Sequence, residues 1–232
     1  MTQYSMHQCK EEGCGFRFPA ASCHPAARRC PVCGAATLVV RGPYGERHMK
    51  NCGPPQGGVE VLALLDNIRS IYNVGSMFRT ADGAGVAHMY LCGITPNPRN
   101  PRLAKTALGA ERTVQWSAHR NGLAVALTLK EQGFRLWALE GGSRSLSLFA
   151  PGLQVLAEPV VLVVGNEVCG VDPDIVEACE RIVSVPMQGC KTSLNAAVAF
   201  AVAVYVLRHG LSPAGLRWQD GSAVKAVPVG GR

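Results

Sequence analysis

Two pairs of closely spaced cysteines stand near the start of the chain and have the chemistry to bind a metal ion. Cys9 and Cys14 are separated by four residues, and Cys30 and Cys33 by two. Two such pairs a short loop apart are typical of a four-thiolate zinc site. A segment of about fifty residues buries too little apolar surface to fold well alone, and a metal crosslink replaces the missing core. We therefore predict a structural zinc ion held by these four cysteines.

The segment that carries these cysteines is also the most basic part of the chain. Residues 1–52 hold seven Lys or Arg and three Asp or Glu, whereas residues 53–212 hold thirteen and twelve. The excess suggests a polyanionic partner such as nucleic acid, although a solvated surface accounts for it equally well. Cys23 and His24 lie between the two cysteine pairs, and either could replace one ligand. We predict a zinc-ribbon-like basic head over residues 1–52. This head either binds RNA or is a purely structural module.

The composition favours a folded intracellular protein over a secreted, disordered or membrane protein. Hydrophobic residues make up 47% of the 232 residues and charged residues 17%, so a real core can form. Met1–Cys9 has no signal-peptide pattern, and clustered cysteines in a reducing compartment favour metal binding over disulfides. The longest apolar run, Ala196–Leu207, is too short to cross a bilayer. We expect a cytoplasmic protein with no membrane segment.

The rest of the chain alternates between strand and helix patterns. Residues 42–58 are rich in glycine and proline, so we place a linker at 53–58, a domain at 59–212 and a flexible tail at 213–232. The alternation predicts an α/β fold, a parallel sheet with helices on both faces. The predicted strands are Val59–Leu65, His88–Cys92, Arg112–Trp116, Phe134–Glu140, Pro159–Val164 and Ile182–Val185. The predicted helices are Asn73–Gly83, Arg102–Leu108, Gly122–Glu131, one that begins at Asp172, and Leu194–Arg208, with Asn73, Asp172 and Ser193 as caps.

Ligands of such sheets usually bind beyond the carboxyl ends of the strands. The informative loops are therefore Asp66–Asn73, Gly141–Ser145, Gly165–Gly170 and Pro186–Ser193. No G-x-G-x-x-G follows the first strand and no Walker A sequence occurs, which argues against a dinucleotide-dependent enzyme and a P-loop nucleotidase.

Three segments in these loops and their flanks together resemble the TrmH-like branch of the SPOUT superfamily, the RNA ribose 2′-O-methyltransferases. They are Leu65–Ala81 (with LDNIR, NVG and FRTA), Leu162–Val171 (LVVGNE, then GV) and Val185–Ala199 (VPM, then KTSLNAAVA). The resemblance covers roughly residues 59–209 and leaves out the cysteine-rich head. It implies a C-terminal trefoil knot, S-adenosyl-L-methionine as the methyl donor, and a homodimer with its active site at the subunit interface.

The resemblance also implies which residues form the site. The cosubstrate pocket would contain Leu139, Gly141, Gly165, Val185, Met187 and Leu194. The reaction would involve Asn73, Arg79, Glu167, Ser193 and Asn195. A guanidinium keeps its proton at neutral pH and is a poor base, so we expect Arg79 to anchor a phosphate and stabilise the forming alkoxide. Glu167 would pair with Arg79 or orient Asn195, and Ser193 could equally be only a helix cap.

The sequence therefore predicts an S-adenosylmethionine-dependent 2′-O-methyltransferase of tRNA or rRNA. Lys191, Arg144 and the basic stretch Asn97–Lys105 are further candidates for RNA contact, or plain surface charge. Three alternatives stay open: a non-catalytic RNA-binding protein on the same scaffold, an accessory factor that acts through its zinc ribbon, and a methyltransferase of a base or small molecule.

Overall fold

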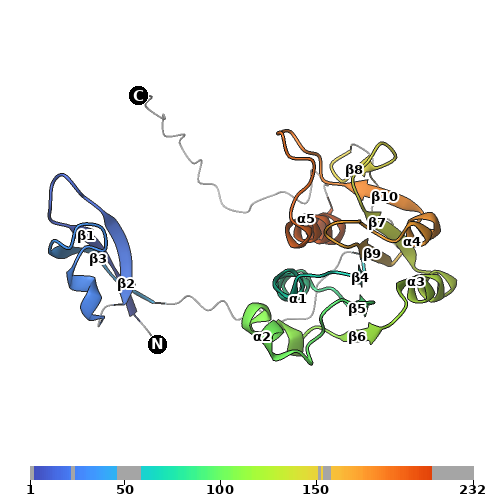
Figure 1. Cartoon of the computed structure of the whole chain (residues 1–232), viewed down its shortest axis with the longest axis horizontal. Coiled ribbons are helices and arrows are strands. Elements are labelled where there is room, and N and C mark those ends of the chain that lie inside the picture. Colours follow the sequence, from blue (N-terminus) through green and yellow to red (C-terminus); the bar gives the residue numbers. More distant parts are fainter. Residues whose placement is uncertain (1–2, 22–23, 46–58, 151–152, 154–157, 211–232) are drawn as a thin grey trace. The chain divides into compact units, whose positions relative to one another are not determined.

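The computed structural model describes residues 3–21, 24–45, 59–150, 153 and 158–210 (Figure 1). Its contacts divide the chain into two compact units, Met1–Gly53 and Pro54–Arg232. The predicted linker at 53–58 and tail at 213–232 lie outside the described residues.

The first unit is a small antiparallel sheet with the strand order β2-β1-β3. Its elements are β1 (Gln3–Cys9), β2 (Arg17–Ala21), the 3-10 turn η1 (Pro25–Arg28) and β3 (Thr37–Gly45). Each cysteine pair lies in a tight turn, and the glycine after it, Gly15 or Gly34, has a positive φ of 54° or 75°. Such a backbone conformation favours glycine, so both glycines suit turns that bring the two cysteines of a pair together.

The second unit is built on a seven-stranded sheet with the order β6-β5-β4-β9-β7-β10-β8, in which every pair of neighbours is parallel. The strands are β4 (Val61–Asp66), β5 (Met89–Cys92), β6 (Trp116–His119), β7 (Arg135–Leu139), β8 (Leu146–Ser147), β9 (Val160–Val164) and β10 (Arg181–Ser184). The helices are α1 (Ile71–Ala84), α2 (Pro101–Ala107), α3 (Gly122–Glu131), α4 (Pro173–Ala178) and α5 (Ala196–His209), with a 3-10 turn η2 (Ala110–Arg112).

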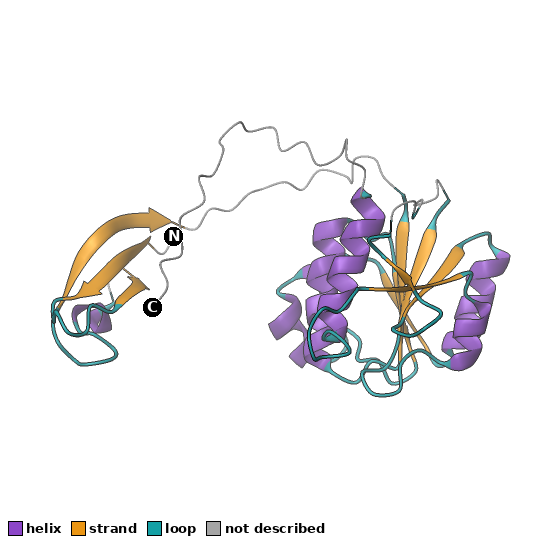
Figure 2. Cartoon of the chain, turned by 90° about the horizontal axis from the view of Figure 1, so that it is seen from above, coloured by secondary structure: helices purple, strands orange, loops and turns teal. Residues whose placement is uncertain are grey.

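Helices cover both faces of this sheet, as Figure 2 shows, and the predicted layer arrangement is confirmed. On one face α1, α2 and α5 pack through residues such as Phe78, Leu103 and Phe200. On the other face α3 and α4 pack through Leu129 and Ile175. All residues of β4 except Asp66 and all of β9 are buried apolar side chains, as expected of central strands between two helical layers. The trefoil knot stays a prediction.

Some predicted elements are wrong at the edges of the sheet. The expected strand Arg112–Trp116 is instead the end of the η2 turn and an approach to β6, which begins at Trp116. Gly109, with a φ of 99°, starts that turn and delays the strand. The two-residue strand β8 was not predicted, since no alternation can be read over two residues.

Two helix caps also differ from the prediction. Ser70, not Asn73, caps α1, because its side chain accepts from the backbone N–H of Asn73. Asn195, not Ser193, caps α5, and its side chain accepts from the N–H groups of Ala197 and Val198. The predicted cap of α4 by Asp172 is confirmed. Both shifts free a side chain, Asn73 or Ser193, for other contacts.

Candidate active site and cysteine cluster

A cavity of about 340 Å³ lies at the carboxyl ends of β7, β9 and β10. Its walls come from the loops that follow these strands and from the start of α5. The cavity brings together all six residues assigned to the cosubstrate: Leu139, Gly141, Gly165, Val185, Met187 and Leu194. It also contains Glu167, Ser193 and Asn195 from the second predicted group.

Gly165 allows the end of β9 to pass directly beneath the loop that follows it. A side chain there would place its Cβ 2.1 Å from the backbone nitrogen of Val171 and 2.2 Å from the carbonyl carbon of Gly170. The loop closes through paired backbone hydrogen bonds of 2.9 Å between Asn166 and Gly170. Backbone packing thus requires glycine at position 165, before any ligand is considered.

Glu140 is a cavity residue that the sequence analysis did not single out. It follows β7 between Leu139 and Gly141, and its Oε2 accepts a 3.0 Å hydrogen bond from the backbone N–H of Val171. The carboxylate therefore ties the end of β7 to the loop after β9. The position of Glu140 in the sequence could have identified it, because a charged residue directly after a buried strand lies at the edge of the sheet where ligands bind.

Three polar side chains from distant segments form one hydrogen-bonded chain beside the cavity. Glu167 accepts from the backbone N–H groups of Arg69 (2.8 Å) and Ser70 (3.0 Å) and from Nδ2 of Asn73 (2.8 Å). Asn73 Oδ1 in turn accepts from Nδ2 of Asn195, at 3.0 Å. The chain joins the loop after β9 to the first turns of α1 and α5.

The Glu167 carboxylate is held in its charged form. Partial burial raises its pKa, but the hydrogen bonds from Arg69, Ser70 and Asn73 outweigh burial and hold the pKa below its ordinary value. An ionised carboxylate whose oxygens already accept three hydrogen bonds is a poor proton acceptor. Its geometry suits it to fix the amide of Asn73, which then fixes Asn195.

Arg79 lies apart from this chain. It is exposed on α1, and its side chain has no hydrogen bond or ion pair with any described residue. Glu167 was predicted to pair with Arg79 or to orient Asn195; among the described residues its carboxylate accepts from Arg69, Ser70 and Asn73 and makes no contact with Arg79. Six residues of helix place Arg79 about 9 Å further along the axis than Asn73. Arg79 is therefore free to meet a ligand outside the cavity.

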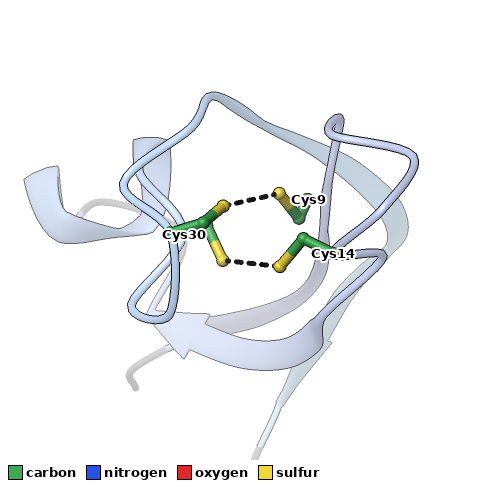
Figure 3. Close-up of side chains that lie close together, drawn as sticks. Cys9, Cys14 and Cys30 are labelled. Carbon is green, nitrogen blue, oxygen red and sulfur yellow. Dashed lines mark hydrogen bonds between the residues drawn. The ribbon is translucent and has the colours of Figure 1, made fainter.

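Figure 3 shows Cys9, Cys14 and Cys30 of the head close together, and the sulfur atoms of these three residues and of Cys33 are all within 4.8 Å of one another. The Sγ distances are 3.4 Å for Cys9 and Cys33 and 3.8 Å for Cys14 and Cys30. A tetrahedral zinc site with Zn–S bonds of about 2.3 Å needs sulfurs about 3.8 Å apart, so the cluster fits zinc closely. Among the described residues the cluster does not include His24, and Cys23 lies outside them.

Backbone donors surround the cluster as well. The N–H groups of Glu11 and Val32 each point at a sulfur, Cys9 or Cys30, at 3.4 Å. Such donors stabilise the thiolate form that a metal requires.

The basic residues proposed as RNA contacts are exposed, and none has an ion pair with a described residue. They are Arg99, Arg102, Lys105, Arg144 and Lys191. None of the helices in the described part of the chain has the length and apolar character needed to span a membrane.

The chain resembles known proteins over its second unit. The model of the SpoU rRNA Methylase family matches residues 60–205. The tRNA (guanosine(18)-2′-O)-methyltransferase of Aquifex aeolicus is 29% identical over 146 residues, which is 63% of this chain and 67% of the relative. The 23S rRNA (guanosine(2553)-2′-O)-methyltransferase RlmP of Bacillus subtilis is 34% identical over 150 residues, 63% of this chain and 57% of the relative.

Solved structures are similar to this chain as well. The A. aeolicus TrmH/SpoU tRNA modifying enzyme superposes with a TM-score of 0.58 at 27% identity, over 65% of this chain and 75% of that one. The AdoMet-bound rRNA methyltransferase of Sinorhizobium meliloti shares the fold, with a TM-score of 0.61 at 24% identity over 68% and 59% of the two chains. The family match spans more than half of the chain and contains the whole cavity, and the chain therefore belongs to the SpoU rRNA Methylase family.

Proposed function

We propose that this protein transfers a methyl group from S-adenosyl-L-methionine to a ribose 2′-hydroxyl of tRNA or rRNA. The observation that carries the proposal is the hydrogen-bonded chain from Glu167 through Asn73 to Asn195, which borders the cavity. Relatives over the same residues are named guanosine 2′-O-methyltransferases of tRNA and of 23S rRNA.

The cavity is our candidate site for S-adenosylmethionine. Its volume of about 340 Å³ lies within the range of small-molecule sites, roughly 300–1,000 Å³. Val185, Met187 and Leu194 offer apolar walls for an adenine ring, and the loop Leu139–Gly142 would close over it. When bound, the sulfonium supplies the electrophilic methyl group, which an in-line attack by the ribose oxygen removes as the S–C bond breaks.

The protein's own contribution would be orientation. Glu167 holds Asn73, Asn73 holds Asn195, and a ribose placed against this rigid edge would face the methyl group. Fixing two reactants in this way can supply about 7–11 kcal/mol in favourable cases. Arg79, exposed on α1, would anchor a phosphate beside the target ribose and stabilise the alkoxide as the hydroxyl gives up its proton to water.

The head would hold one structural zinc ion through Cys9, Cys14, Cys30 and Cys33. Apart from these cysteines, few side chains in the described part of the head are buried. The bound ion would therefore supply most of the free energy that folds the head. No step of methyl transfer involves this metal.

We further propose that the protein is a cytoplasmic homodimer with its site at the subunit interface. Large apolar side chains near the cavity support this: Tyr72 on α1 is 70% exposed, Val168 is 77% exposed and Val198 on α5 is 49% exposed. Each is next to a member of the hydrogen-bonded chain, since Tyr72 precedes Asn73, Val168 follows Glu167, and the N–H of Val198 donates to Asn195. Exposed apolar groups of this kind beside polar residues mark interaction surfaces.

Calorimetric titration with S-adenosylmethionine tests the site. Leu194→Arg should abolish binding, whereas Leu127→Arg should not, since Leu127 is comparably exposed (44% against 37%) but lies on α3. Total tRNA and rRNA incubated with methyl-labelled cosubstrate should then yield labelled 2′-O-methyl nucleotides after nuclease digestion. Cosubstrate binding without any label would favour a different acceptor. RNA binding with no cosubstrate binding, even when RNA is present, would favour the non-catalytic alternative.

A further inference from the structure

A second cavity, of about 500 Å³, lies between α3 and the outer strands β5 and β6. Two rings, Tyr90 and His119, and the apolar side chains of Val125 and Leu129 line it, together with Arg120 at the end of β6. We call it the α3 groove. It shares no lining residue with the cavity assigned to the cosubstrate.

Hydrogen bonds through Ser117 and ring contacts hold the rings of the groove in place. Ser117 Oγ lies 2.9 Å from Nε2 of His88 and 2.7 Å from Nε2 of His119. The Tyr90 ring is 4.4 Å from the His88 ring and 5.8 Å from the His119 ring, both in tilted contact. The hydroxyl can donate to one imidazole and accept from the other, so both histidines are held without a carboxylate. The groove thus presents preorganised aromatic surface.

The charge of the groove favours an anion. Arg120 is exposed and has no ion pair with a described residue, and no described carboxylate lines the groove. Helix α3 begins beside Arg120, with Asn121 as its cap and no acidic residue in its first turn. A cation, a helix N-terminus and ring faces together match the phosphate and base of a nucleotide.

One end of the groove, at His119 and Arg120, lies at the same edge of the sheet as the cosubstrate cavity. Because all seven strands are parallel, the carboxyl end of β6 at His119 lies at the same edge as the carboxyl end of β9. Three neighbouring strand pairs separate β6 from β9, which corresponds to about 14 Å. Stacked nucleotides rise about 3.4 Å each, so at least about four of them are needed to bridge the two sites.

We propose that the α3 groove binds a nucleotide of the RNA substrate at least about four positions from the methylated one, with its base against Tyr90 and His119 and its phosphate at Arg120. This inference rests on the proposed RNA methyltransferase function. It assigns RNA affinity to the domain itself, in addition to any contact by the basic head.

Matched arginine variants test the proposal. Arg120 follows the end of β6, whereas Arg112 precedes its start and is also highly exposed, with 85% of its side chain accessible. Binding of tRNA and rRNA and of a fluorescein-labelled 12-nucleotide single-stranded RNA of mixed sequence would be measured by anisotropy from low to moderate salt. Arg120→Ala should weaken binding roughly tenfold at low salt and reduce the salt slope by about 0.7, whereas Arg112→Ala should not.

Tyr90→Phe should keep RNA affinity and Tyr90→Leu should lose about fivefold or more, as expected for a stacked base. Ultraviolet crosslinking should map RNA to peptides that contain Tyr90 or His119. Methyl transfer separates this inference from the proposed function: with wild-type activity present, Arg120→Ala should raise KM for RNA and leave the affinity for S-adenosylmethionine unchanged. Equal RNA affinity of the Arg120→Ala and Arg112→Ala variants, with no crosslink at the groove, would overturn the inference. A wild-type protein that transfers no methyl group but binds RNA through Arg120 would overturn only the proposed function.

Discussion

Glu167→Gln is the substitution that most directly probes the hydrogen-bonded chain of the site. One carboxylate oxygen accepts from the backbone N–H of Arg69, and the other accepts from Ser70 N–H and from Asn73. A glutamine can offer one oxygen only, so its NH₂ group must face a donor. The variant therefore loses at least one hydrogen bond to a charged acceptor and gains a donor–donor contact.

The expected magnitude follows from that loss. A hydrogen bond to a charged group contributes about 1.5–3 kcal/mol, and exposure of Glu167 reduces this to about 1–2 kcal/mol. For a domain of this size, such a change lowers Tm by about 2–8 °C. Release of Asn73 should also let Asn195 move, and a displacement of about 1 Å can slow the reaction up to a hundredfold. We expect kcat to fall about ten- to hundredfold.

The assay combines thermal unfolding of the zinc-loaded protein with methyl transfer at saturating RNA and cosubstrate. Glu131→Gln is the control, since Glu131 ends α3 and has no contact with the site. The double variant Glu167→Ala/Asn73→Ala should cost less than the sum of the two single variants, because both remove the same link. Unchanged Tm and kcat in Glu167→Gln, or strict additivity in the double variant, would refute the reasoning.

Three further predictions address other parts of the molecule. A chelator should release about one zinc ion per chain and unfold the head while Tm of the larger domain stays constant; retention of the head's circular dichroism would contradict this. Gly165→Ala should abolish S-adenosylmethionine binding and destabilise the domain by about 1–3 kcal/mol, whereas Gly141→Ala, with no atom within 4 Å of the added Cβ, should remain as stable as wild type. Burial, and then the charge of His119, lowers the pKa of His88 in the folded protein. His88 of the unfolded chain therefore binds a proton at a higher pH, so the free energy of unfolding should fall as the pH drops below about 6.5. His88→Gln should reduce this dependence of stability on pH, and an unchanged dependence in the variant would contradict the assignment.

Strong local patterns predicted the centre of the fold. The apolar run Val160–Val164 is the central strand, Gly122–Glu131 is a helix with the expected bounds, and Asp172 caps α4 as predicted. Each of these depends on residues that are neighbours in sequence, so local propensity decides it. Edge strand β6 was misplaced and β8 missed because short, half-exposed strands owe their existence to a neighbouring strand and carry little signal of their own.

The candidate site could be predicted only in part, for the same reason. The family resemblance identified most of the site residues, but the hydrogen bonds between them depend on tertiary packing. Nothing near Glu167 in sequence indicates that its carboxylate meets Asn73, 94 residues away, and not Arg79. Glu140 was missed because its partner, the N–H of Val171, is a backbone atom with no sequence signature.

The hydrogen bond between Asn73 and Asn195 has a consequence for the protein during its synthesis. The two residues are 122 positions apart, and the ribosome needs about 6–24 s to add that many residues. Until α5 has emerged, a nascent chain can have β4 and α1 in place but lacks one wall of the cosubstrate cavity. A chain truncated before α5 should thus not bind S-adenosylmethionine, and binding of the methyl donor would report that α5 has been synthesised and has folded.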